Sequence, residues 1–195
     1  MLAILIPLSA FLIENWWENN YQSVPVYESV FKEGETKPQD YHFINQYGEN
    51  IHAGMWANSI TVVDFFFTSC PTICPKMTNN LKKVQEQFGS NIQILSFTVD
   101  PEHDTPEKLS RYAKHNSILQ LNWQFITGDK KVIYKLARRG FKLAAAGGDG
   151  GPEDFIHSNK LVLVDGKQRI RGYYDGTSAV EVKNMMRDIS KLQNE

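Results

Sequence analysis

Residues 59–75 read Ser-Ile-Thr-Val-Val-Asp-Phe-Phe-Phe-Thr-Ser-Cys-Pro-Thr-Ile-Cys-Pro. The first part, residues 59–68, is a dense run of β-branched and aromatic side chains with little alternation of polar residues. A run of this kind predicts a central strand that is buried on both faces of a sheet. Cys70 and Cys74 follow at once, so we expect both of them on the turn that leaves this strand.

A helix is predicted directly after the turn. Met77, Leu81, Val84 and Phe88 recur at helical spacing, and Gly89 is a residue type that commonly ends a helix. In open α/β sheets, ligands bind beyond the carboxyl ends of the strands, where loops and helix N-termini meet. The strand-to-helix turn is therefore the candidate site.

The rest of the chain continues the alternation of strands and helices, and an antiparallel hairpin with a helix closes it. This order predicts an α/β layered sheet with a late antiparallel pair. The further elements are strands over residues 41–44, 92–99, 123–127, 160–165 and 168–174, a helix capped by Thr105 with Pro106 first and continuing over 108–115, a helix opened by Asp129, and a closing helix over 177–193 with Val180, Met185, Met186 and Ile189 apolar.

Length and composition limit the classes of protein. The chain has 195 residues, which allows one domain and a short appendage. Its 42% hydrophobic and 22% charged residues are ordinary for a soluble globular domain. With 21 Lys and Arg against 22 Asp and Glu, no basic surplus is available to neutralise phosphates, so we expect no nucleic-acid partner. Two cysteines exclude a disulfide-rich scaffold and a four-cysteine zinc site.

The N-terminus carries an apolar run over residues 1–13 that is too short to span a bilayer core of about 30 Å. We interpret it as a signal-like or anchor-like segment that places the domain outside the cytoplasm, although no Lys or Arg precedes it. A buried first helix or a strand of the domain is the alternative. Residues 14–37 are predicted as a linker, and residues 38–195 as the domain.

The cysteine pair is the strongest chemical signal. A helix N-terminus carries about half a positive charge, which favours thiolate over thiol. We therefore expect Cys70 and Cys74 to be exposed, paired and prone to ionise. Three residues separate them, a spacing that can hold a metal ion or close as a disulfide. The plain alternative is a structural disulfide or two buried thiols.

A soft metal ion held by two thiolates needs a third ligand, and His157 is the candidate. It follows a Gly-rich loop over residues 141–152 and precedes the hairpin, which can pair near the central strand. His42 and His115 are expected to be surface residues and His103 a solvated loop residue, whereas His52 lies just before the central strand with no ligand-type neighbours. Two sulfurs and one imidazole form a soft set that favours Cu(I), with Cu(II) as a second state, whereas zinc prefers four ligands.

Three motifs in order resemble the SCO/SenC family of copper-handling proteins, which have a thioredoxin-like fold. They are Phe65-Phe-Phe-Thr-Ser-Cys-Pro-Thr-Ile-Cys-Pro75, the stretch Ser96-Phe-Thr-Val-Asp-Pro-Glu-His-Asp-Thr-Pro106, and His157 ahead of Leu161-Val-Leu-Val-Asp-Gly166. The resemblance extends from about Pro38 to Leu192. It implies a three-layer thioredoxin-like fold with a mixed sheet and a C-terminal antiparallel hairpin and helix.

The resemblance also implies a function and a site. Copper would be bound by Cys70, Cys74 and His157, with Asp100 supporting the site rather than ligating. The role implied is maturation of the copper centre of cytochrome c oxidase, as a metallochaperone or as a thiol reductant, with the copper subunit of the oxidase and a copper donor protein as partners. A membrane-anchored domain facing the periplasm or the intermembrane space is implied as well.

Three other functions remain open. The same Cys70 and Cys74 would serve a thiol–disulfide oxidoreductase, in which one thiolate attacks and the other resolves. A peroxidase of the peroxiredoxin kind shares the fold, but Thr68 lies only two residues before Cys70 and no Arg is close in sequence. A structural or adaptor domain with an inert disulfide is the third.

Overall fold

The computed structural model describes residues 23–31, 41–52, 54, 57–143 and 158–195. This part of the chain forms a seven-stranded mixed sheet in the order β2-β1-β5-β4-β3-β6-β7. The strands are β1 (His42–Asn45), β2 (Asn50–His52), β3 (Thr61–Phe66), β4 (Gln93–Thr98), β5 (Trp123–Gly128), β6 (Lys160–Val164) and β7 (Ile170–Asp175). The helices are α2 (Ile73–Phe88), the 3₁₀ turn η3 (Gly89–Asn91), α3 (Pro106–His115), α4 (Lys130–Lys135), its π-helical continuation η4 (Leu136–Gly140) and α5 (Ala179–Leu192).

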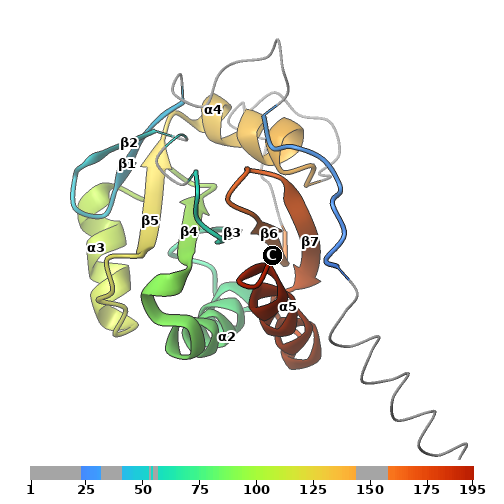
Figure 1. Ribbon diagram of the computed structural model, residues 1–195. Coiled ribbons are helices and arrows are strands. Elements are labelled where there is room, and N and C mark those ends of the chain that lie inside the picture. The colour runs from blue at the N-terminus through green and yellow to red at the C-terminus, as the bar shows by residue number, and fades with distance from the viewer. Residues whose placement is uncertain (1–22, 32–40, 53, 55–56, 144–157) are drawn as a thin grey trace, which may run out of the picture.

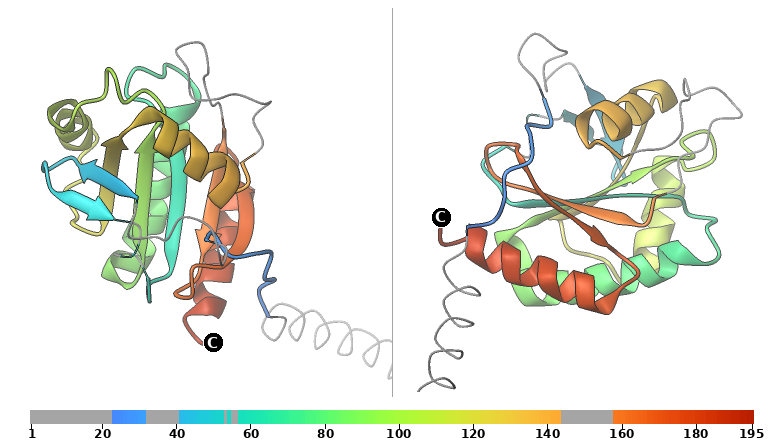
Figure 2. Two further views of the ribbon diagram at one scale, coloured as in Figure 1. Left: turned by 90° about the horizontal axis from the view of Figure 1, so that it is seen from above. Right: turned by 90° about the vertical axis from the view of Figure 1, so that its right-hand side faces the viewer.

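Helices cover both faces of the sheet, which gives three layers (Figures 1 and 2). Alternate residues of β3 point to opposite faces, so Val62 packs with the core under α2, α3 and α5, whereas Val63 packs with the core under α4. All six residues of β3 are buried, as predicted for a central strand. The three-layer mixed sheet with its late hairpin and helix confirms the expected fold class.

The strand register brings two loops to the candidate site. β3 and β4 are parallel, with Phe66 opposite Thr98 at their carboxyl ends. The turn that carries the cysteines and the loop that starts at Asp100 therefore leave the sheet side by side at the same edge. This is the edge where ligands are expected in an α/β sheet.

Local sequence signals explain where several helices begin and end. The Thr105 hydroxyl accepts a hydrogen bond from the Lys108 amide at the start of α3, and the Asp129 carboxylate accepts one from the Val132 amide at the start of α4. Gly89 follows α2 with a φ of 54°, a left-handed conformation that glycine adopts without a Cβ clash. These three predictions are confirmed.

Two features differ from the sequence prediction. The short strand β2 pairs with β1 at the sheet edge, but its three residues are too few to show a pattern. Val180 was predicted on the apolar side of the closing helix, but it is 69% exposed. Val182 is buried instead, because with Met185 and Ile189 it keeps the spacing of three and four that faces the sheet.

Part of the predicted linker packs against the hairpin. Val24 and Val30 are buried, and the Tyr27 amide donates to the Ile170 carbonyl at 2.9 Å. Within the described residues, no helix combines the length and the apolar character that crossing a membrane requires.

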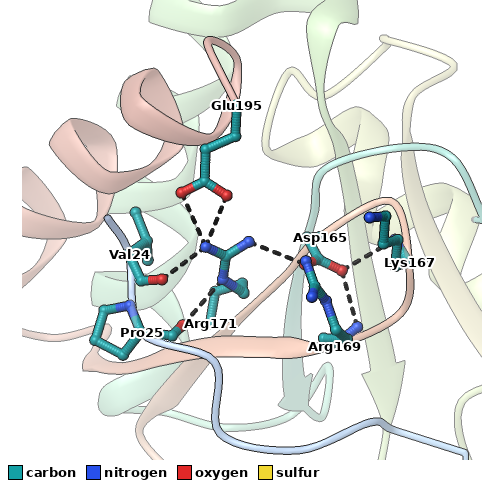
Figure 3. Close-up of polar contacts among 7 residues, drawn as sticks. All are labelled: Val24, Pro25, Asp165, Lys167, Arg169, Arg171 and Glu195. Carbon is teal, nitrogen blue, oxygen red and sulfur yellow. Dashed lines mark hydrogen bonds and ion pairs between the residues drawn. The ribbon is translucent and has the colours of Figure 1, made fainter. Parts of the chain in front are cut away.

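Arg171 joins this N-terminal segment to the domain (Figure 3). The Arg171 side chain is 3% exposed and donates to the carbonyls of Val24 and Pro25. It also forms ion pairs with Asp165 and Glu195, and the nitrogen-to-oxygen distance in each pair is 2.9 Å. Together with the backbone hydrogen bonds between residues 27–30 and 168–170, these contacts of Arg171 hold the segment against the hairpin.

Candidate metal and thiol site

The two cysteines lie at the N-terminus of α2, directly beyond β3. Cys70 precedes the N-cap residue Thr72, and Cys74 lies in the first helical turn. No side chain caps this helix end, and the Cys74 amide donates to the Cys70 sulfur at 3.5 Å. Both cysteines are free thiols, so the site brings together two sulfurs that are not joined by a disulfide.

The expectation that both cysteines are exposed is wrong. Cys70 is 8% exposed and Cys74 is 2% exposed. The spacing of α2 explains the burial of Cys74, because Cys74, Met77 and Leu81 follow one another at three and four residues on the face that packs against the sheet. The pair forms the outer margin of a hydrophobic core.

The two thiols differ in their tendency to ionise. Burial by itself raises the pKa of Cys70, but hydrogen bonds from the Cys74 thiol and from the backbone amides of Thr72, Ile73 and Cys74 bring it below its usual value. Burial raises the pKa of Cys74 to about 12, and its hydrogen bond to Cys70 acts in the same direction. Only Cys70 therefore fits the prediction of a thiol that ionises readily.

A buried carboxyl group lies on β3 on the core side of the site. Asp64 accepts a hydrogen bond from the Ser96 hydroxyl at 2.5 Å, and that hydroxyl accepts one from the Trp123 indole at 3.0 Å. Burial raises the pKa of Asp64 to about 7, and a negative charge there also raises the pKa of Cys74. Sequence reasoning missed Asp64, although an acidic residue inside an apolar strand was a visible signal.

A second buried carboxylate, Asp104, joins the cysteine turn to the neighbouring loop. It accepts hydrogen bonds from the Thr68 amide at 3.0 Å, the Thr68 hydroxyl at 2.5 Å and the Thr98 hydroxyl at 2.6 Å. The Lys108 ammonium lies 3.2 Å away. The sequence showed Asp104 only as one of several acidic residues in a loop, so its burial could not be predicted.

Asp100, predicted to support the site, lies in the same loop. Its carboxylate is 2.8 Å from the His103 ring, and this pairing raises the pKa of the His103 imidazole. Its backbone amide donates to the Thr98 hydroxyl at 3.0 Å. Asp100 thus contributes to the loop that Asp104 organises.

The third predicted ligand, His157, and most of the Gly-rich loop before it lie outside the described residues. His42 and His115 are exposed, as expected, and His52 is exposed as well. Within the described ranges, no three Cys, His, Asp or Glu side chains meet in a way that could hold a metal ion. The structure therefore brings two of the three predicted ligands together and leaves the third untested.

The donor chemistry of the described site fits a soft metal ion. Two sulfurs meet at one helix N-terminus, where the backbone amides stabilise negative charge on the Cys70 sulfur. Soft thiolate donors favour Cu(I), and two sulfurs leave room for one further donor from outside the described residues.

Comparisons with known proteins agree on one family. A family model described as SCO1/SenC matches residues 31–194. The SCO1 protein homolog of Bacillus subtilis is 30% identical over 155 residues, which cover 77% of this chain and 80% of that protein. A candidate copper-binding protein of Stutzerimonas stutzeri is 27% identical over 117 residues, covering 57% of this chain and 56% of that protein.

A solved structure that is similar to this chain belongs to the same family. It is described as identifying a disulfide switch in BsSco, a member of the Sco family of cytochrome c oxidase assembly proteins. It aligns with a TM-score of 0.72 at 27% identity, covering 89% of this chain and 98% of that chain.

Proposed function

This chain belongs to the SCO1/SenC family, and from that membership we propose that it binds copper and acts in the assembly of cytochrome c oxidase. The metal is cargo, taken from a donor protein and delivered to the copper subunit of the oxidase. The observation that carries the proposal is the meeting of two free thiols, Cys70 and Cys74, at one helix N-terminus.

Two sulfurs and the imidazole of His157 are the proposed ligands. The asymmetric thiols suit a transfer site, because Cys70 ionises first and can make the first bond to an incoming ion, after which Cys74 loses its proton. Cu(I) is the proposed cargo state, since sulfur donors favour it, and Cu(II) is a second state. The copper-binding name of the Stutzerimonas relative supports the choice of metal.

The experiment is copper analysis of the reduced chain after equilibration with Cu(I) and removal of weakly held metal. We expect one copper per chain in the wild type, and none in Cys70→Ser or Cys74→Ser. We expect weakened binding in His157→Ala. His115→Ala is the matched control, because His115 is exposed on α3. Undiminished copper in both serine variants would reject the proposal.

The asymmetry of the thiols also favours a second candidate function, thiol–disulfide exchange. The Cys70 thiolate attacks a partner disulfide and forms a mixed disulfide, and one partner sulfur leaves as thiolate. The Cys74 sulfur, losing its proton, then attacks the Cys70 sulfur of the mixed disulfide. The products are a Cys70–Cys74 disulfide and a partner dithiol, so two electrons pass to the partner.

His157 separates the two functions, because thiol exchange does not need an imidazole. If His157→Ala loses copper affinity and keeps its exchange rate, metal binding uses the third ligand and exchange is a parallel activity. If copper affinity is unchanged in this variant, the three-ligand site is rejected and thiol exchange becomes the preferred function.

The proposal extends to location. We propose that residues 1–13 anchor the domain to a membrane on its extracytoplasmic side. The full chain is then expected in the membrane fraction, and a chain lacking residues 1–13 in the soluble fraction. Recovery of the full chain from the cytosol would contradict this location.

A further inference from the structure

Asp104 is the most completely hydrogen-bonded side chain near the cysteines among the described residues, although it is not one of the proposed ligands. Its carboxylate is fully buried. It accepts three hydrogen bonds, at 3.0, 2.5 and 2.6 Å, and has the Lys108 ammonium at 3.2 Å. Both oxygens are used, since Oδ1 meets the Thr68 hydroxyl and Oδ2 meets the Thr68 amide.

These partners come from three different parts of the chain. Thr68 follows β3, Thr98 ends β4, and Lys108 lies in the first turn of α3. The contacts to Thr98 and Lys108 are local, because they lie six and four residues from Asp104. The contacts to Thr68 span 36 residues and are the ones that reach the cysteine turn.

The segment from Thr68 to Cys70 is short, and hydrogen bonds fix both of its ends. Asp104 fixes the amide and the hydroxyl of Thr68, and Cys70 is only two residues further on. The Cys70 amide then donates to the Phe67 carbonyl at 3.2 Å, and the Cys70 sulfur accepts from the Cys74 amide. A change at Thr68 is therefore expected to move the Cys70 sulfur relative to the helix N-terminus.

A purely structural role accounts poorly for the choice of residue. Burying a carboxylate costs several kcal/mol, and apolar residues of similar volume often replace buried ion pairs with no loss of stability. The rigid, two-oxygen geometry gives directional control of Thr68, which an apolar side chain cannot give.

We propose that Asp104 is a positioning residue, which acts through Thr68 to hold the Cys70 sulfur at the N-terminus of α2. The proposal rests on the proposed function in one respect, namely that Cys70 is the thiol that ionises and reacts first. Asp104 itself touches neither metal nor partner.

The test is the equilibrium between the dithiol and disulfide forms of the chain in glutathione buffers, without copper. The helix N-terminus favours the reduced, ionisable Cys70, so losing its position shifts the equilibrium toward the disulfide. In a buffer whose pH is high enough to ionise Cys70, we expect Asp104→Asn and Thr68→Val each to shift the equilibrium constant by about three- to tenfold toward the disulfide.

Thr98→Val is the matched control, because it removes another hydroxyl from the same carboxylate, and with it the acceptor of the Asp100 amide, and leaves both Thr68 contacts in place. It is expected to lower the melting temperature as Thr68→Val does, but to change the redox equilibrium by less than about twofold. This comparison stands even if Asp104→Asn does not fold.

The double variant Asp104→Asn/Thr68→Val shows whether the two residues act together. If Asp104 acts through Thr68, the double variant shifts the equilibrium no further than Asp104→Asn alone. Additive shifts, no shift, or an equal shift in Thr98→Val would overturn the proposal. Because copper is absent from the assay, failure of the wild type to bind Cu(I) would reject the proposed function and leave this test intact.

Discussion

Replacing Asp64 by Asn is expected to stabilise the protein, and to do so more strongly as the pH rises. Asp64 is 4% exposed on the central strand, and burial raises its pKa from 3.8 to about 7. A carboxyl group whose pKa is raised on folding binds its proton more tightly in the folded state. Its contribution is therefore fully present below the unfolded pKa and is lost as the pH rises through the folded value.

The size of the effect follows from the same two pKa values. A difference of about 3 pKa units corresponds to about 4 kcal/mol of folding free energy above about pH 8. At about pH 5 the loss is only about 2 kcal/mol, because Asp64 is still protonated in the folded state and this pH lies only about one unit above the unfolded pKa of 3.8. The advantage of Asp64→Asn over the wild type should thus grow by about 2–3 kcal/mol between about pH 5 and about pH 8.5.

Urea unfolding of both proteins at the two pH values measures this growth. The Asn side-chain oxygen can still accept the hydrogen bond from the Ser96 hydroxyl, so the pH-independent change is expected to be small. Glu107→Gln is the control, since Glu107 is exposed and its pKa is lowered through its hydrogen bond with Thr105. A constant difference between wild type and Asp64→Asn across this range would show that Asp64 is not forced to ionise in a buried site.

Other consequences concern the thiols and the N-terminal segment. Near neutral pH, Cys70 should react with a small alkylating reagent at least about tenfold faster than Cys74, because its pKa is lowered and that of Cys74 is raised. Mass spectrometry measures both rates, and equal rates would contradict this order. Cu(I) affinity, measured by competition with a chelator, should fall as the pH decreases. It should fall by about tenfold per pH unit above the pKa of Cys70, where only Cys74 loses a proton on binding, and by about a hundredfold per unit below it, where both cysteines do. A pH-independent affinity would exclude thiolate ligands. Arg171→Met should lower the free energy of unfolding in urea by about 3 kcal/mol and expose residues 23–31 to protease, because Asp165 loses a buried partner. Arg169→Gln, at the more exposed position, should lower it by less than about 1 kcal/mol. Equal losses in the two variants would contradict the role assigned to Arg171.

The order of strands and helices could be predicted because its signals are local. The apolar run of β3, the threonine and proline at the start of α3, and Gly89 after α2 each act within a few residues. Val180 shows the limit of such reasoning, because an apolar residue in an amphipathic helix need not lie on the buried face. The face is set by the sheet against which α5 packs.

The site could be predicted only in part, for a related reason. The positions of Cys70 and Cys74 on a strand-to-helix turn follow from local sequence, and both cysteines were identified. Their burial depends on α2 packing against the sheet, and the roles of Asp64 and Asp104 depend on partners 32 and 36 residues away. Spacing along the chain gives no direct signal for contacts of that range.

X-ray absorption at the copper edge of the Cu(I)-loaded chain reports which atoms bind the metal. We expect two sulfur scatterers, from Cys70 and Cys74, and one imidazole nitrogen that disappears in His157→Ala. A spectrum with no sulfur, or with an imidazole signal that persists in His157→Ala, would contradict the three-ligand copper site.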